Sequence, residues 1–454
     1  MRQPLRPFEG RLPESTASAV LPRGFRAAAA ALGIKASGKP DVALVSVSEG
    51  APDAAVAAVF TSNAVVAAPL ILSQQHLRSV EPQGEGRYGW SRGVVCTAGC
   101  ANAATGADGL ADQESLAKAF ARGLGTDSER TLAMSTGVIG TRLPAERLSP
   151  EIGRLAQDGL SDGPAALADA AEAMCTTDSR PKSATVRLTL PDRDGRPVPI
   201  TVSGIAKGVG MIHPQMATML AILLTDAVVT PAILHGLLRP VAARTWDQLT
   251  VDSDTSTNDT VFLFASGAAG AGPIGEGSPD EASLRDAVEA VARSLARQQA
   301  ADGEGATTLI TCQVSGAADD AEARAVARSV VASSLVKAAV HGRDPNWGRI
   351  VAAAGNARLA PAAVLEAAGL GADEALRRAG TAVRLDVARL RVAICGVDVF
   401  DGLPVTFERP AVRALMAAPE VVIRLDLGLG DGRGEAFGCD LTEAYVVENA
   451  EYST

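Results

Sequence analysis

The sequence lacks any apolar run long enough to cross a membrane. The apolar run at residues 216–225 is about half of the roughly 20 residues that a helix needs to span a bilayer. Residues 1–24 carry scattered arginine and proline and no apolar segment of the kind found in secretory leaders, so they are expected to form a flexible N-terminal extension. These absences predict a cytoplasmic protein with no membrane partner.

Aromatic residues are also scarce, at 3 % of the chain, whereas apolar residues in total reach 47 %. The core must therefore be built mainly from alanine, valine, leucine and isoleucine. The 454 residues suffice for a large core in two lobes. The net charge of −10 argues against a broad nucleic-acid-binding surface, although one local positive group would still hold an anionic substrate.

Histidine and cysteine are too sparse and scattered to indicate a metal site. The four histidines cannot be grouped with a serine and an acid, and only Cys96 and Cys100 of the six cysteines stand close together. "GIKASGK" at 33–39 has Pro40 where a phosphate-binding loop needs serine or threonine, and "DSDTSTND" at 252–259 lacks the glycine and glutamate of a calcium loop. We expect no metal and no bound cofactor, and we interpret 252–259 as a polar turn or an active-site loop.

Strand and helix patterns mix along the chain without a regular strand–helix–strand period, which favours an α+β fold in layers over a doubly wound sheet. Strands are expected at 40–50, 54–63, 93–99, 130–140 and after Thr218, with a hairpin around "PDRDGR" and later strands within 307–316, 389–397 and 420–428. Helices are expected at 112–125, 162–175, 281–300, 321–341 and 372–379.

The run "KGVGMIHPQMATML" at 207–220 places a hydroxyl at the entrance of a buried strand. Without a histidine, a hydroxyl nucleophile needs another base, and a free α-amine with a pKa of about 7.7–8.0 is suitable. Such an amine arises if the bond between Ala217 and Thr218 breaks through an acyl shift to the Thr218 hydroxyl. The alternative is that Thr218 is an ordinary threonine of a strand.

Several motifs together resemble the ornithine acetyltransferase family, that is, the glutamate N-acetyltransferases. The resemblance runs in order from about residue 24 to the C-terminus, through the run at 207–220 and through "GFRAAAAALGIKASGKPDVALV", "STGVIG", "TTDSRPK", "VDSDTSTNDT", "DGEGATTLI", "DPNWGRI" and "GCDLTEAYVVENAEYST". It implies a layered helix and sheet sandwich of the N-terminal-nucleophile-like type. It also implies self-cleavage into an alpha chain (25–217) and a beta chain (218–454), assembled as a heterotetramer of two alpha and two beta chains.

The resemblance further implies transfer of acetyl from N-acetylornithine to glutamate through an acetyl-threonine, as in arginine biosynthesis, with acetyl-CoA as a co-substrate of some members. Thr218 matches the nucleophile, and Thr136 and Gly137 match the oxyanion-hole pair. The remaining matches are to positions that contact the substrate: Thr176, Lys207, Glu304, Asn449 and Thr454. The match at Thr176 is ambiguous by one residue. Glu304 is also suited to moving a proton.

The chain departs from the family where it has "TAGCANAATG" at 97–106 in place of "NSGNANACTG". If Thr97, Ala98 and Cys100 line or brace the acyl pocket, this change shifts the specificity, as in a paralogue specialised for secondary metabolism. Two other readings stay open: an N-terminal-threonine amidase or aminopeptidase, in which water takes the acyl group, and a non-catalytic protein that keeps the fold.

Overall fold

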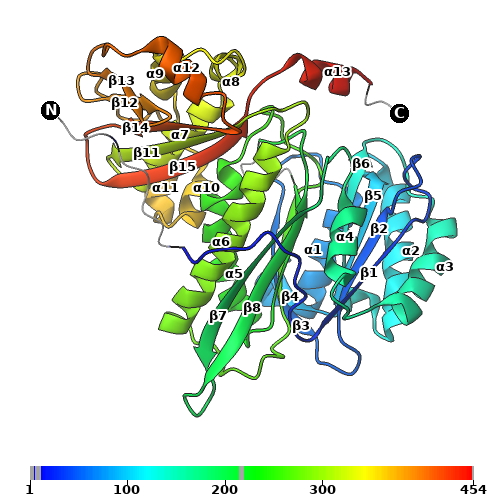
Figure 1. The fold of residues 1–454 in the computed structure, drawn as a ribbon. Coiled ribbons are helices and arrows are strands. Elements are labelled where there is room, and N and C mark those ends of the chain that lie inside the picture. The colour runs from blue at the N-terminus through cyan, green and yellow to red at the C-terminus, as the bar shows by residue number, and fades with distance from the viewer. Residues whose placement is uncertain (1–4, 6–11, 214–218, 452–454) are drawn as a thin grey trace.

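The structure is a computed structural model that describes residues 5, 12–213 and 219–451. In these ranges the strands form three sheets (Figure 1). The four-stranded sheet has the order β1 (Phe25–Ala30), β2 (Val42–Val47), β5 (Gly93–Cys100), β6 (Thr131–Val138). The six-stranded sheet has the order β4 (Tyr88–Ser91), β3 (Ala54–Phe60), β10 (Thr260–Ala265), β9 (Leu220–Thr225), β8 (Pro197–Lys207), β7 (Lys182–Pro191). The five-stranded sheet has the order β13 (Val397–Asp401), β12 (Arg391–Ile394), β14 (Glu420–Asp426), β11 (Leu309–Ala317), β15 (Gly432–Cys439).

Helices separate and cover the first two sheets, which gives a lobe of five layers. The helices α1 (Ala68–Val80) and α4 (Ala166–Met174) pack between the two sheets. The outer faces are covered by α2 (Gly106–Leu124) and α3 (Ala145–Arg154) on one side and by α5 (Pro231–Arg244) and α6 (Pro279–Ala301) on the other. The short helical turns η1 (Pro82–Gly84), η2 (Ser128–Arg130), η3 (Leu155–Gly159) and η4 (Trp246–Gln248) connect these elements.

The five-stranded sheet forms the second lobe. Its helices are α7 (Asp320–Ala332), α8 (Ser334–His341), α9 (Trp347–Gly355), α10 (Ala362–Ala367), α11 (Ala372–Arg378) and α12 (Arg409–Leu415), and the chain continues from β15 into α13 (Glu443–Glu451). The long α6 joins the lobes, because Arg293 and Arg297 on it lie over the ring of Phe437 in β15. The predicted α+β class with layers in two lobes is confirmed.

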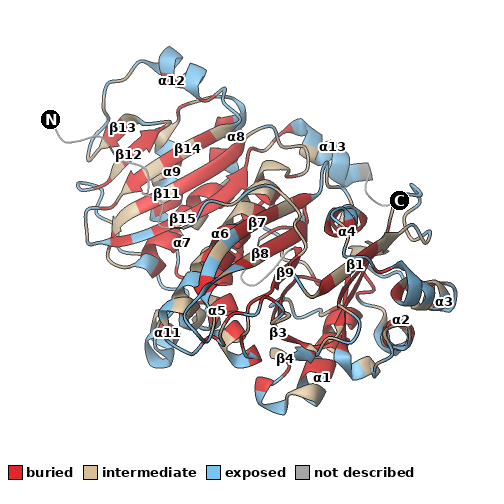
Figure 2. Cartoon of the chain, turned by 60° about the horizontal axis from the view of Figure 1, so that its bottom comes forward, coloured by how far each residue is buried: buried red, intermediate tan, exposed pale blue. Residues whose placement is uncertain are grey.

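Burial follows the layers (Figure 2). Every residue of β2, β3, β9 and β10 is buried, since both faces of these strands are covered, and this explains why their sequences are continuous apolar runs rather than alternating ones. Alanine at many helix and strand positions lets the layers pack closely without large aromatic side chains. None of the helices in the described ranges is long and apolar enough to cross a bilayer.

The described part of the predicted N-terminal extension lies against the edge of the six-stranded sheet. Thr16 and Thr185 of β7 exchange two backbone hydrogen bonds, each of 2.9 Å. Further along, the backbone nitrogen of Arg23 donates to the Asp226 carboxylate at 3.4 Å.

One predicted helix is wrong in its extent. The expected helix at 321–341 is interrupted at Ser333, which has an extended backbone (φ −68°, ψ 113°) and ends α7. The Ser333 hydroxyl accepts a hydrogen bond from the backbone nitrogen of Val336 and so caps α8. Serine competes with the helix for backbone hydrogen bonds, which makes this a favourable point for a break.

The strands β5 and β6 approach most closely at two glycines. Gly99 and Gly137 lie opposite each other with positive φ angles of 116° and 128°, where β5 bulges. A Cβ atom on Gly137 would lie 2.2 Å from the carbonyl carbon of Gly99. Only glycine therefore fits at position 137, at the end of β6.

We expect Gly137→Ala to lower the free energy of unfolding by about 3 kcal/mol or more, because it adds a backbone clash to an unfavourable φ angle. Gly140→Ala is the matched control: Gly140 also has a positive φ (85°), but no atom lies within 4 Å of an added Cβ, so we expect a loss of about 1 kcal/mol. Urea titrations of the two variants measure the difference. Equal losses would contradict the close-approach argument.

Candidate active site

A cavity of about 390 Å³ lies where β6 and β8 end and β9 begins. It is lined by almost all of the described residues that the sequence predicts to be functional, together with the loop 256–259. Those predicted residues are Thr136, Gly137, Thr176, Lys207, Glu304 and Asn449. They come from two strand ends, two loops and α13, so the fold gathers positions that are far apart in the sequence.

Lys207 is the central cation of this cavity. It is the last residue of β8 and is 7 % exposed. Its Nζ donates to the Thr176 hydroxyl at 2.7 Å and to the Thr136 hydroxyl at 3.1 Å. The lysine thus connects the end of β6 to the loop after α4, and it brings one positive charge to the wall of a partly apolar cavity.

Asp178 provides the compensating charge, and sequence reasoning missed it. Its side chain is fully buried, and its carboxylate lies 3.8 Å from Lys207 and also binds Lys182. It accepts hydrogen bonds from the backbone nitrogens of Thr176 and Gly208 at 3.1 and 2.9 Å. Burial opposes ionisation of this carboxyl, but the two lysines together with the backbone bonds lower its pKa below the usual value.

Lys182 extends the ionic cluster to Asp302. Its side chain has no exposed surface, and its Nζ binds both Asp178 and Asp302, each at 2.5 Å. Asp302 directly follows α6 and also accepts from the backbone nitrogen of Ser179 at 3.0 Å. Each buried charge thus has an opposite charge in contact, which is the condition under which buried ions are tolerated.

Glu304 also lines the cavity, and two donors hold it there. Its Oε1 accepts from the Thr177 hydroxyl at 2.8 Å, and its Oε2 accepts from the Asn449 side-chain amide at 3.0 Å. Gly210 makes room for it, because a Cβ atom there would lie 2.1 Å from Glu304 Oε2. The two adjacent threonines thus have different contacts: Thr176 contacts the lysine and Thr177 contacts the glutamate.

The loop that resembled a calcium site is part of the cavity wall. The Asn258 amide nitrogen donates to the Ala101 carbonyl at 2.7 Å and to the Ser135 carbonyl at 2.9 Å. Asn258 therefore fixes the loop to β5 and β6, which agrees with an active-site loop. In the part of the chain that the structure describes, no three or more His, Cys, Asp or Glu side chains are placed to hold a metal ion.

No histidine lines this cavity. His213 lies close in sequence, but its ring is directed to the Thr250 hydroxyl, 3.0 Å away. Burial, with the neighbouring Arg328 and Lys337, lowers the pKa of His213 to about 3, so the ring is neutral at pH 7.

Some predicted positions are not part of the observed wall. Ala217, Thr218 and Thr454 lie outside the described residues. Thr97, Ala98 and Cys100, at which the chain departs from the family motif, are buried in β5 and do not line the cavity. Ala98 and Cys100 pair with β6 at Thr136, so these positions lie behind the wall.

The buried Lys207 and the carboxylate of Glu304 line one small cavity, which is an arrangement suited to a small zwitterionic substrate. The model of the ArgJ family matches residues 26–454. The protein named arginine biosynthesis bifunctional protein ArgJ of a Synechococcus strain is 42 % identical over 95 % of this chain and 96 % of its own. The protein of the same name from Thermus thermophilus is 42 % identical over 96 % of this chain and 99 % of its own. This chain therefore belongs to the ArgJ family.

Among solved structures, the arginine biosynthesis bifunctional protein argJ of Bacillus halodurans is similar, with 37 % identity and a TM-score of 0.45. The match covers 51 % of this chain and 99 % of that chain. A structure of ornithine acetyltransferase from Mycobacterium tuberculosis, complexed with ornithine, has 36 % identity and a TM-score of 0.38, covering 45 % of this chain and 99 % of that one.

We expect Asp178→Asn to destabilise the protein by about 3–5 kcal/mol at pH 7. The substitution leaves Lys182 with Asp302 alone and removes the carboxylate that lies beside Lys207. In the wild type, the lowered pKa means that the contribution of Asp178 is complete above about pH 4 and is lost as the pH falls through that pKa. Denaturation curves between pH 3 and pH 7, with the exposed Asp162→Asn as control, test this. A variant as stable as the control would show that the cluster contributes nothing.

Proposed function

We propose that this chain is a self-processing acetyltransferase that moves an acetyl group from N-acetylornithine to glutamate through an acetyl-threonine at position 218. One observation carries the proposal: Lys207, Thr136, Thr176 and Glu304 face one cavity whose wall includes Met219. Thr218 directly precedes Met219 in the sequence. Family membership supports the same activity, because the relatives are named for arginine biosynthesis.

In the proposed processing, the Thr218 hydroxyl attacks the Ala217 carbonyl, and the acyl group moves from nitrogen to oxygen. Water then hydrolyses the ester, which leaves an alpha chain ending at Ala217 and a beta chain beginning at Thr218. The two chains stay together through the layered core, and we propose that two such pairs form the heterotetramer. The glycines at 208 and 210 support this step, because they give the preceding segment backbone freedom.

In the proposed first half-reaction, the Thr218 hydroxyl attacks the acetyl carbonyl of the donor. The α-amine of Thr218 takes the hydroxyl proton and returns it to the departing ornithine nitrogen, so the amide bond breaks as the ester forms. The end of β6 at Thr136 and Gly137 supplies donors to the oxyanion. Lys207 faces the substrate carboxylate, and Glu304 faces the side-chain ammonium.

In the second half-reaction, the amine of glutamate attacks the ester carbonyl. The threonine oxygen leaves as the hydroxyl and recovers its proton through the α-amine, and N-acetylglutamate departs. Both half-reactions use one oxyanion position and one base. Asn449, which donates to Glu304, orients that carboxylate from α13. Thr454 lies three residues beyond α13 and is the second C-terminal position that the family resemblance assigns to the substrate.

We expect wild-type protein to separate into two chains on a denaturing gel and Thr218→Ala to remain one chain of 46.3 kDa. N-terminal sequencing of the beta chain should read Thr-Met-Leu-Ala. Thr225→Ala, which changes another threonine of the same segment, is the control and should still be cleaved. Cleavage of the Thr218→Ala variant would contradict the proposed nucleophile.

We expect the fragment that begins at Thr218 to gain the mass of one acetyl group when the processed enzyme is mixed with N-acetylornithine alone. Adding glutamate should remove that group, because the covalent intermediate is shared by the two half-reactions. Rapid quenching followed by intact mass measurement detects the intermediate. Turnover without any acetylated fragment would require direct transfer in a ternary complex and would rule out the covalent route.

A further inference from the structure

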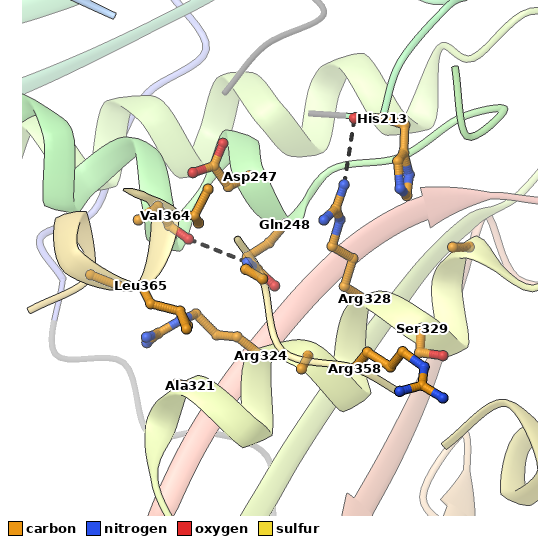
Figure 3. A pocket seen from close by; sticks show the side chains of 15 residues that line it. His213, Asp247, Gln248, Ala321, Arg324, Arg328, Ser329, Arg358, Val364 and Leu365 are labelled. Atoms are coloured by element: carbon orange, nitrogen blue, oxygen red, sulfur yellow. Dashed lines mark hydrogen bonds between the residues drawn. The ribbon is translucent and has the colours of Figure 1, made fainter. Parts of the chain in front are cut away.

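A second cavity, of about 180 Å³, lies where the two lobes meet (Figure 3). Its walls come from the end of α5 and from η4 in the five-layer lobe, and from α7, α10 and the segment before α10 in the other lobe. It shares no lining residue with the active-site cavity. Nothing in the proposed transferase chemistry uses it.

Two arginines of α7 enter this cavity one helical turn apart. Arg324 is 9 % exposed, and its side chain forms no hydrogen bond or ion pair with any residue that the structure describes. Arg328 donates to the His213 carbonyl at 3.4 Å, but its Nε is buried without a partner (Figure 3). Like charges at this spacing repel each other, so two under-partnered guanidinium groups on one helix face require an explanation.

Nearby carboxylates offset part of the charge of the two arginines. Asp320, Asp319 and Asp247 act to raise the pKa of Arg324, and Asp247 does the same for Arg328, but burial outweighs them. Asp247 lines the cavity, but Arg239 binds it at 3.1 Å. Arg358 adds a third guanidinium from the segment before α10, and it contacts the Gly380 carbonyl at 3.3 Å. His213 stays neutral because its pKa is lowered to about 3. Among the described residues that line the cavity, three arginines stand against one aspartate, so the lining carries an excess of positive charge.

Burial lowers the pKa of Arg328 to about 10, although the charge of Asp247 acts in the opposite direction. Burial lowers the pKa of Arg324 as well. Both guanidinium groups stay protonated at pH 7, in surroundings where an anion is attracted more strongly than in bulk water. A guanidinium group also presents paired donors that match carboxylate and phosphate oxygens.

We propose that this cavity binds a small organic anion, whose carboxylate or phosphate oxygens are held by Arg324 and Arg328. Part of the remaining wall is apolar, with Ala325, Val364 and Leu365 suited to a short hydrocarbon part. Because α7 belongs to one lobe and η4 to the other, the bound anion stabilises the junction between the lobes.

Isothermal titration with succinate and with inorganic phosphate, in a buffer low in chloride, tests this proposal. We expect saturable binding to the wild type with a Kd of about 0.1–10 mM and a rise in the melting temperature. Arg324→Gln should weaken binding by about 10- to 100-fold, since it removes a charge-assisted contact. Ala325→Leu keeps both arginines and should also abolish binding by filling the cavity, so it serves if Arg324→Gln does not fold.

Two controls separate this site from the rest of the molecule. Arg187→Gln changes an exposed arginine of β7, and Lys207→Met removes the cation of the active-site cavity. Arg187→Gln should bind the probes as the wild type does, and Lys207→Met should keep the binding that Arg324→Gln weakens. The proposal is overturned if the wild type binds neither probe, or if binding survives Arg324→Gln and Ala325→Leu but is lost in Lys207→Met.

Discussion

The buried carboxylate of Asp178 between Lys182 and Lys207 is the interaction on which the candidate active site depends. An isolated buried lysine loses its hydration without compensation, and it would either lose its proton or unfold its surroundings. Asp178 lies between the two lysines, and Asp302 binds Lys182 in turn, so charges of opposite sign alternate along the cluster. Lys207 in turn donates hydrogen bonds to the hydroxyls of Thr136 and Thr176.

This cluster also joins the segments that lie before and after position 218. Lys182 and Thr177 precede that position, whereas their partners Asp302 and Glu304 follow it. The Gln299 amide adds a third connection by donating to the Lys207 carbonyl at 2.8 Å. The same contacts that shape the cavity would therefore hold an alpha and a beta chain together after cleavage. The pairing of β8 with β9, which lie on either side of the proposed cleavage position, would also hold the two chains together.

The sequence predicted strands correctly where a continuous apolar run is buried on both faces, as in β2, β3 and β9. The residues that line the cavity were predicted through the family motifs. It missed α1, because that helix begins at Ala68-Pro69 and continues through polar residues without a clear apolar stripe. It also missed Asp178. This carboxylate belongs to an ionic cluster that includes Asp302, which is 120 positions from Lys182 and comes close to it only in the folded chain. The departures at Thr97, Ala98 and Cys100 were conspicuous in the sequence, yet they lie behind the wall, where only tertiary packing could place them.

The central claim is that the acetyl group passes from one amino acid to another and not to water. The most direct measurement follows the isotopically labelled acetyl group of N-acetylornithine through turnover by the processed enzyme in the presence of glutamate. The account predicts that the label is recovered in N-acetylglutamate, with little free acetate. Recovery of the label as acetate, at a rate that glutamate does not change, would identify a hydrolase and contradict the account.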